Sequence, residues 1–319
     1  MASAITYSSL GGPEVLTLTE VDVLPPGPGE VAVRIEAAGV NPLDAKLRSG
    51  IRPSPPITSP RRIGADGAGV VTALGADVEG LRVGDAVVIA GASGLYATDV
   101  VVPAETVTPR PPQVSAAEAA ALGVPAGTAY QVLRSLGAGA ADTVLVHAGS
   151  GAVGQLVVQF AVLWGATVVA TTSERRAGRV VALGAIPVRY GAGLADRVRE
   201  AAPQGVTVAI DAAGTDEAIA ASLELVADRG RIATLVRGAD AGALGIRSYL
   251  GGSPHPLTPA QRALRAEAVP ISLHLLAAGA LDIELGPSFP LADAAAAHRA
   301  IEAGADGKIV LVAGEPAGA

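Results

Sequence analysis

Cysteine is absent from this chain of 319 residues. This absence excludes disulfides, thiolate zinc sites and a cysteine nucleophile. Aromatic residues make up only 3% of a sequence that is 50% hydrophobic, so the cores must be built from alanine, valine, leucine and isoleucine. The net charge is −7, and the chain has no long basic run. We therefore expect neither nucleic acid nor an anionic membrane surface as a partner.

The sequence also shows no pattern typical of a targeting segment or a membrane-spanning helix. Residues 1–7 lack a basic region followed by an apolar run, so we predict no signal peptide. Glycines interrupt the most apolar stretch, residues 145–170, and no run of about 18 residues could cross a bilayer. We expect a cytoplasmic protein, and the richness in alanine, glycine and arginine is typical of a GC-rich bacterial genome.

The hydrophobic pattern divides the chain into regions with different predicted secondary structure. Short segments in the first 110 residues alternate polar and apolar positions between turns, which predicts a β-rich domain of barrel type. From about Ser115, helical and strand patterns alternate, which predicts a parallel sheet with helices on both faces. The tail suggests a strand at 281–285, a helix at 291–302 and a strand at 308–312, and we expect it to rejoin the first domain.

We therefore predict an α/β fold that combines a Rossmann doubly wound parallel sheet with a β-rich barrel domain. The expected boundaries are residues 1–120 for the first part of the β-rich domain, 121–255 for the parallel-sheet domain and 256–319 for the return of the chain to the β-rich domain. At 319 residues the chain is long enough for two domains.

The stretch from Asp142 to Gly154 carries the strongest functional signal. It places a G-x-G-x-x-G motif after a buried strand and before a helix, which is the context that a dinucleotide-binding loop requires. The first glycine permits the tight turn, the second lets a diphosphate approach the backbone, and the third lets the helix pack against its strand. The helix N-terminus then offers free N–H groups to phosphate. The predicted cofactor-binding loop is Gly149, Ser150, Gly151, Ala152, Val153 and Gly154.

The next strand, residues 167–172, ends at the position that selects the cofactor. An NAD-preferring site places Asp or Glu there to bind the ribose hydroxyl, whereas this chain has Ser173 followed by Glu174, Arg175 and Arg176. Guanidinium groups match a phosphate dianion, so we expect NADPH rather than NADH. In the alternative interpretation, Ser173 is an ordinary helix cap and the arginines are solvated.

Almost the whole chain resembles the zinc-free quinone oxidoreductases related to zeta-crystallin, within the medium-chain dehydrogenase/reductase superfamily. The matching motifs are Gly39-Val40-Asn41-Pro42, Gly64-Ala65-Asp66-Gly67, Gly127-Thr128-Ala129-Tyr130, the loop above and Gly307-Lys308-Ile309-Val310. The resemblance implies a GroES-like catalytic domain, a Rossmann domain, an active site in the cleft between them, NADPH as cofactor and a homodimer. It also implies that Ser173 and Arg176 contact the 2′-phosphate, Tyr190 the adenosine phosphate, Thr128 the nicotinamide and Asn41 the substrate.

Some positions depart from related families. Zinc-dependent relatives would carry Cys near Asn41 and His-Glu at Ala65-Asp66, so we predict no metal. Enoyl-thioester reductases carry a tyrosine proton donor about where Arg52 stands here. The diphosphate loop of the family usually has paired glycines, and here Ala152 replaces the second.

Few side chains are candidates for the chemistry itself. Asn41 and Tyr130 are our catalytic candidates, although Asn41 could instead order its loop and Tyr130 could pack in a core. We expect His147 to be a hydrogen-bonded core histidine, and His274 and His298 to lie on helix surfaces. The roles of loops 50–62 and 238–259, the second of which contains Tyr249 and His255, stay open.

Three functions are compatible with these residues. The first is transfer of hydride from NADPH to a quinone without a metal. The second is NADPH-dependent reduction of the C=C bond of an enone or enoyl compound in a biosynthetic pathway. The third is NADPH binding with little turnover, as a structural or sensing protein. In each enzyme case the partner is a small-molecule electron acceptor.

Overall fold

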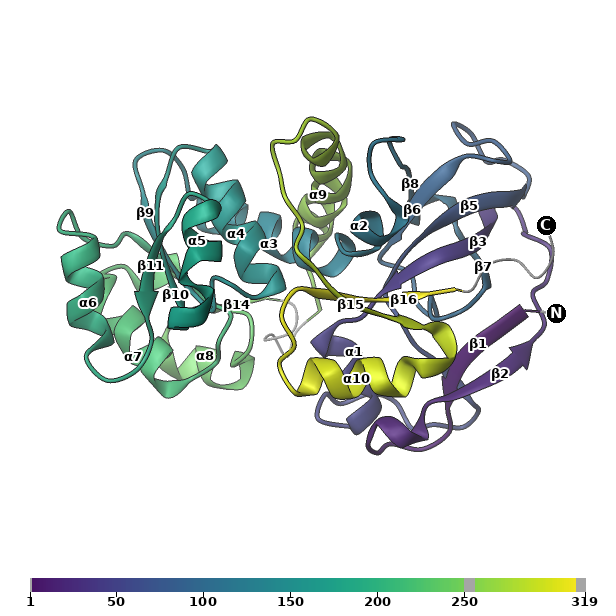
Figure 1. The fold of residues 1–319 in the computed structure, drawn as a ribbon, viewed down its shortest axis with the longest axis horizontal. Helices are drawn as coiled ribbons and strands as arrows, with labels where there is room; N and C mark the ends of the chain where they lie inside the picture. The colour runs from purple at the N-terminus through teal and green to yellow at the C-terminus, as the bar shows by residue number, and fades with distance from the viewer. Residues whose placement is uncertain (1, 250–255, 314–319) are drawn as a thin grey trace. The chain divides into compact units, whose positions relative to one another are not determined.

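The computed structural model describes residues 2–249 and 256–313 (Figure 1). The chain forms two compact units. The split unit comprises Met1–Val124 and Val269–Ala319, and the central unit comprises Pro125–Ala268. The chain passes into the central unit within helix α3 (Gly123–Leu136) and leaves it within helix α9 (Pro259–Ala277).

The central unit is a parallel six-stranded sheet with strand order β11-β10-β9-β12-β13-β14. In chain order this sequence of neighbours is 3-2-1-4-5-6, the Rossmann arrangement, whose order reverses between β9 and β12. Its strands are β9 (Thr143–His147), β10 (Thr167–Thr172), β11 (Ile186–Arg189), β12 (Val208–Asp211), β13 (Ile232–Thr234) and β14 (Arg247–Ser248). Its other helices are α4 (Ala152–Leu163), α5 (Ala177–Ala182), α6 (Leu194–Ala201), α7 (Asp216–Leu225) and α8 (Gly238–Leu244).

Helices cover both faces of this sheet because its central strands are apolar on both sides. All five residues of β9 are buried. Leu145 and Val169 pack into one core with side chains from α6, α7 and α8. Val144 and Val168 point to the opposite face because side chains alternate along a strand. A sheet buried on both faces needs such continuous apolar strands.

The split unit is built mainly from antiparallel strands. A three-stranded sheet has the order β2-β1-β4, and a seven-stranded sheet has the order β15-β16-β3-β5-β6-β8, with β7 also pairing with β3. The strands are β1 (Ala2–Tyr7), β2 (Thr17–Val21), β3 (Glu30–Gly39), β4 (Arg61–Arg62), β5 (Asp66–Leu74), β6 (Ala86–Ala90), β7 (Asp99–Pro103), β8 (Val107–Pro109), β15 (Leu285–Pro290) and β16 (Lys308–Val312). The helices are α1 (Pro42–Ser49), α2 (Ala116–Ala120) and α10 (Ala294–Glu302).

The predicted fold class is confirmed, with two local differences. The strand expected at residues 281–285 is wrong, since β15 begins only at Leu285, where pairing with β16 starts at Lys308. Helix α1 was not predicted because its short sequence has no long apolar period, although Asn41 before Pro42 is a good start signal. Residues 250–255, including His255, lie outside the described residues. Among the described residues, no helix is long and apolar enough to cross a membrane.

Candidate functional site

The loop between β9 and α4 has the geometry of a nucleotide-binding turn. The chain reverses at Ala148, whose φ of 57° is unusual for a residue with a side chain. Gly149 is needed here for close packing, because a Cβ on it would lie 2.5 Å from the Cβ of Ala170 on β10. The tight turn expected at Gly149 is thus made by Ala148, and the glycine allows the neighbouring strand to approach.

The other two glycines of the motif meet different constraints. A Cβ on Gly154 would lie 2.1 Å from the carbonyl oxygen of Ala148, so only glycine lets α4 pack this close to its strand. Gly151 is the N-cap of α4 with extended backbone, φ −79° and ψ 166°. A Cβ there would meet only the Ala148 oxygen, at 3.4 Å, so the space beside Gly151 is open. The cradle at this helix N-terminus fits a diphosphate.

Hydrogen bonds hold the loop against the neighbouring strand and helix. The Thr172 hydroxyl donates to the Ser150 hydroxyl (2.9 Å). The Ser150 carbonyl accepts from the Gln155 amide (2.9 Å) and from a guanidinium nitrogen of Arg176 (3.2 Å). Arg179 in turn donates to the Gln155 side chain (2.7 Å). The guanidinium of Arg176 therefore lies beside the diphosphate loop.

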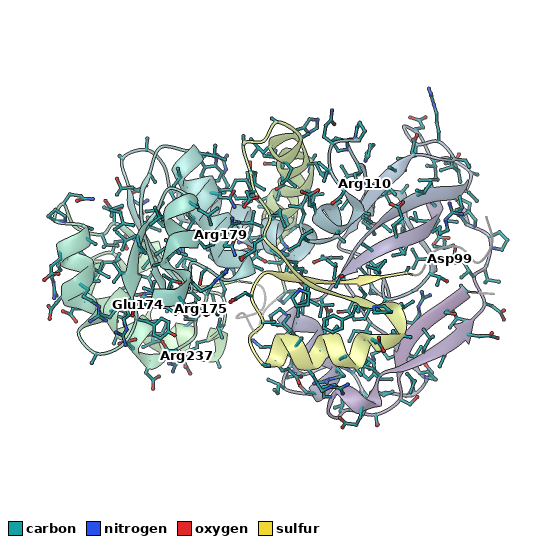
Figure 2. The ribbon with its side chains drawn as sticks, viewed as in Figure 1. Asp99, Arg110, Glu174, Arg175, Arg179 and Arg237 are labelled. Carbon is teal, nitrogen blue, oxygen red and sulfur yellow. The ribbon has the colours of Figure 1, made fainter. Side chains whose placement is uncertain are left out.

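The tip of β10 carries the residues expected to select the cofactor. Ser173 caps the 3-10 turn Glu174–Arg176 by position, but its side chain makes no capping hydrogen bond. Glu174 and Arg175 are exposed and follow one another on this turn, and Arg179 lies further along on α5 (Figure 2). No carboxylate thus occupies the strand end itself. Tyr190, just after β11, is 56% exposed.

Two candidates on α3 are buried and have partners in the central unit. The Thr128 hydroxyl accepts from Arg265 (3.0 Å). The Tyr130 hydroxyl donates to Glu267 (3.2 Å), and its ring packs edge-on against Phe160 and Trp164. Burial and the Glu267 hydrogen bond raise the pKa of Tyr130, which makes the phenol a weaker acid.

His147 is a core residue, as predicted. It is 1% exposed, and its Nε2 lies 3.1 Å from the Ser222 hydroxyl. Burial lowers the pKa of His147 to about 4, and the nearby Asp211 only partly opposes this shift. His147 is therefore neutral at physiological pH and acts as part of the scaffold.

In the split unit, Asn41 belongs to a buried polar cluster. Its side-chain amide donates to Asp66 (2.9 Å), and its side-chain oxygen accepts from the ammonium of Lys308. Lys308 lies 3.7 Å from Asp66, and both side chains are at least 95% buried. Sheet register brings these residues together, since β3 ends at Gly39 with Asp66 of β5 opposite it and Val310 of β16 on its other side.

A second carboxylate completes the cluster. Asp44 accepts from the Asn41 backbone N–H (2.9 Å) and from the Tyr96 hydroxyl (3.0 Å). Burial, with a smaller contribution from Asp66, raises the pKa of Asp44 to about 6. Burial also lowers the pKa of Lys308, against the attraction of Asp66 and Asp44. Lys308 thus compensates one of two buried carboxylates, and the Asn41 amide is held from both ends.

Sequence reasoning did not assign roles to Asp44, Asp66, Tyr96 or Lys308. A signal was available, because Lys308 opens an otherwise apolar strand, and strand positions of this kind rarely carry a charge without a partner. The sequence does not show which residues pair with Lys308, and one of them, Asn41, lies 267 residues away in the chain.

The prediction that His298 lies on a helix surface is wrong. Its side chain is fully buried and packs edge-on against the Tyr96 ring. The reason lies in α10, where His298 shares with Ala294 and Ala297 the face that the helix buries, so a polar ring occupies a core position. His274 is exposed, as predicted.

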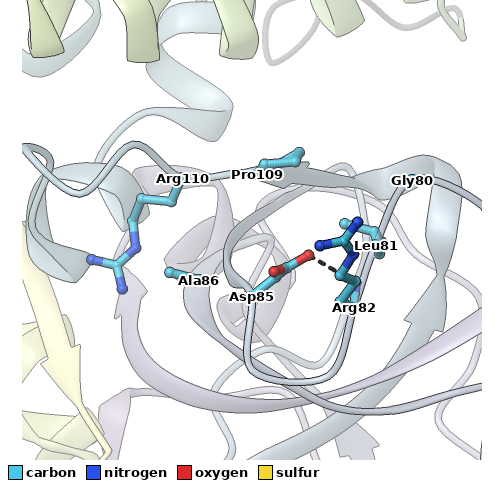
Figure 3. Close-up of a pocket in the computed structure, with 7 residues that line it drawn as sticks. All are labelled: Gly80, Leu81, Arg82, Asp85, Ala86, Pro109 and Arg110. Carbon is cyan, nitrogen blue, oxygen red and sulfur yellow. Dashed lines mark hydrogen bonds between the residues drawn. The ribbon is translucent and has the colours of Figure 1, made fainter.

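Elsewhere, the split unit has a hollow of about 490 Å³ lined by Gly80, Leu81, Arg82, Asp85, Ala86, Pro109 and Arg110 (Figure 3). Arg110 is already paired with Glu36 (2.7 Å), and Asp85 accepts from the backbone N–H of Arg82 (2.8 Å). Within the described part of the chain, no three His, Cys, Asp or Glu residues gather as a metal site would require.

Known proteins resemble this chain over nearly its full length. The family profile described as "Alcohol dehydrogenase GroES-like domain" matches residues 27–112, and the one described as "Zinc-binding dehydrogenase" matches residues 183–311. A quinone oxidoreductase of Pseudomonas aeruginosa is 31% identical, covering 95% of this chain and 97% of the relative. A phthioceranic/hydroxyphthioceranic acid synthase of Mycobacterium tuberculosis is 32% identical over 94% of this chain, which matches 15% of that protein.

Solved structures agree with the sequence relatives. The Escherichia coli quinone oxidoreductase, solved in complex with NADPH, is 27% identical with a TM-score of 0.84, covering 98% of this chain and all of that one. Together with the Rossmann strand order and the glycine loop, these matches confirm the resemblance noted in the sequence. The chain is an oxidoreductase that belongs to the quinone oxidoreductase family of the medium-chain dehydrogenase/reductase superfamily.

Proposed function

We propose that this protein uses NADPH to reduce a quinone by hydride transfer without a metal ion. The observation that carries the proposal is the β9–α4 loop, where Gly151 leaves open space at a helix N-terminus. NADPH, when bound, supplies the hydride to the acceptor. The remaining steps belong to the protein, which binds and orients the partners and excludes water.

The residues of the central unit fit NADPH. Backbone N–H groups of residues 149–154 would hold the diphosphate, and Ser173 and Arg176 would hold the 2′-phosphate. The contact from Arg176 to the Ser150 carbonyl supports this role because it keeps the guanidinium at the loop. We propose that Tyr190 lies beside the adenosine phosphate and Thr128 beside the nicotinamide. We assign NADPH binding to the central unit and acceptor binding to the split unit.

The state of the two catalytic candidates favours a quinone as acceptor. Asn41 and Tyr130 both donate to carboxylates, Asp66 and Glu267. A reduced quinone is a stabilised anion that can take its proton from water, whereas the enolate formed from an enone gains from a protein donor. We propose that Asn41 contacts the acceptor, oriented by Asp66 and Lys308, whereas Tyr130 of the central unit is held by Glu267 and packs in the core.

A second candidate is reduction of a C=C bond in a biosynthetic pathway. The match to part of a mycobacterial phthioceranic/hydroxyphthioceranic acid synthase favours it, because a reductase of this type can be one segment of a synthase. The name of the synthase identifies its product only. We therefore keep quinone reduction as the first candidate, because several relatives are quinone oxidoreductases.

Incubation of the protein with NADPH and a panel of quinones and enones tests the proposal. We expect NADPH oxidation with quinones and much slower oxidation with NADH. Turnover with enones alone would replace the first candidate by the second, and NADPH binding without turnover would indicate a structural or sensing role. Gly151→Val is the matched control, since it should remove turnover with every acceptor.

We also propose that the protein is a cytoplasmic homodimer. Light scattering coupled to size-exclusion chromatography measures the mass directly, and a monomer of 31.4 kDa at working concentration would contradict the dimer.

A further inference from the structure

Helices α1 and α10 of the split unit enclose polar atoms that have no partner among the described residues. Arg48 on α1 is 2% exposed and His298 on α10 is fully buried. One terminal nitrogen of Arg48 donates to Glu302 (2.5 Å), but its Nε and Nη1 make no hydrogen bond to any residue that the structure describes. The same holds for both ring nitrogens of His298. Four buried nitrogen atoms are thus unsatisfied in two side chains whose helices pack together.

Proteins rarely leave such atoms unpaired, because each has lost its hydrogen bonds to water. The usual solution is buried water that serves several polar groups at once. Arg48 reaches α10 at Glu302, one helical turn from His298. Burial, with a smaller contribution from the Arg48 charge, lowers the pKa of His298 to about 4. At neutral pH the imidazole is therefore uncharged, with one N–H donor and one acceptor nitrogen.

The chemistry of the four atoms selects the occupant. Arg48 offers donors only, whereas neutral His298 offers a donor and an acceptor. Water can accept from Arg48 and donate to His298. A small anion could accept from Arg48, but Glu302 already pairs with that charge, and the acceptor nitrogen of His298 would repel an anion.

We propose that the interior between Arg48 and His298 is a binding site for water, which links α1 to α10 by hydrogen bonds. A water on one ring nitrogen of His298 cannot serve the other, because the two point to different sides of the ring, so the site holds about two molecules. This site is independent of cofactor and acceptor.

A high-resolution crystal structure of the full chain, grown with sodium bromide, tests the occupant. We expect ordered water within hydrogen-bonding distance of Arg48 Nε or Nη1 and of His298, without an anomalous bromide peak there. A bromide peak would identify an anion site instead. Direct contacts from Arg48 and His298 to protein acceptors, with no solvent between them, would also overturn the proposal.

A double-mutant cycle tests the shared water in solution. Arg48→Met and His298→Leu should each lower the Tm by several degrees. The double variant should lose clearly less than the sum of the two losses, because either substitution alone already disrupts the hydrogen bonds of the shared water. Strictly additive losses would contradict a shared site. His274→Leu, at an exposed position of α9, is the matched control and should change the Tm by much less, because His274 contacts only the Pro270 carbonyl of its own helix. If the variants fail to fold, the crystal structure of the unmodified protein still decides.

Discussion

Two glycines of one loop should respond to substitution in opposite ways. In Gly154→Ala the new Cβ would lie 2.1 Å from the Ala148 oxygen and 2.8 Å from the Gly149 Cα, where ordinary contact begins near 3.4 Å. Helix α4 would have to move by about 1.3 Å, and overpacking of this kind costs about 1–3 kcal/mol. We expect the Tm to fall by about 3–10 °C.

Gly151→Val should leave the fold intact and remove the function. Its extended backbone suits a β-branched residue, and its Cβ would contact only the Ala148 oxygen, at 3.4 Å. Loss of an N-cap glycine is partly offset by the lower entropy of the unfolded chain, so the cost should stay below about 1 kcal/mol. The added methyl groups would occupy the space of the diphosphate, and NADPH affinity should fall at least about 100-fold, or ~2.7 kcal/mol.

Circular dichroism gives the Tm of both variants, and the fluorescence of Trp164, the one tryptophan of the chain, gives NADPH affinity. Trp164 lies at the C-cap of α4, the helix whose N-terminus forms the loop. Unchanged NADPH affinity in Gly151→Val would show that the loop is misassigned. A Gly154→Ala variant as stable as the unmodified protein would refute the packing argument.

Three further predictions use other parts of the molecule. Arg176→Ala should weaken NADPH binding by about 1.5–3 kcal/mol and NADH binding far less, as measured by calorimetry; equal losses would make Arg176 a scaffold residue. Lys308→Met leaves Asp66 buried without its cation, so urea unfolding should show a loss of about 3–5 kcal/mol, and a loss below ~1 would be inconsistent with the cluster. Stability should fall between pH 6.5 and 4, since the pKa values of His147 and His298 are lowered to about 4 and the unfolded chain takes up protons first. The pKa of Asp44, raised to about 6, opposes part of this loss, and His147→Gln should flatten the pH profile.

Local patterns were enough to predict the architecture of the central unit. Strand β10 has the predicted bounds, residues 167–172, because its run of valine, alanine and threonine is continuous. The loop after β9 was predicted because strand, glycines and helix are adjacent in the chain. A pattern confined to about 15 residues can predict a strand, loop or helix without knowledge of distant contacts.

The polar cluster of the split unit could not be predicted in this way. Asn41, Asp66 and Lys308 meet only because β3 pairs with both β5 and β16, and pairing between distant strands leaves no local mark. His298 shows the same limit in a helix, since it lies with Ala294 and Ala297 on the face that α10 buries, and its polar ring gives no local sign of the Tyr96 ring against which it packs. Contacts of long sequence separation are thus the part that composition and periodicity do not encode.

The position of Lys308 after the central unit has a consequence for synthesis on the ribosome. The central unit is one continuous stretch, so it can fold as soon as it has emerged. The earlier segment of the split unit has to wait, because Asp66 has no cationic partner until Lys308 has been translated. A nascent polypeptide that stalls before β16 would therefore expose an unfinished sheet to proteases and chaperones, while its nucleotide-binding half was already formed.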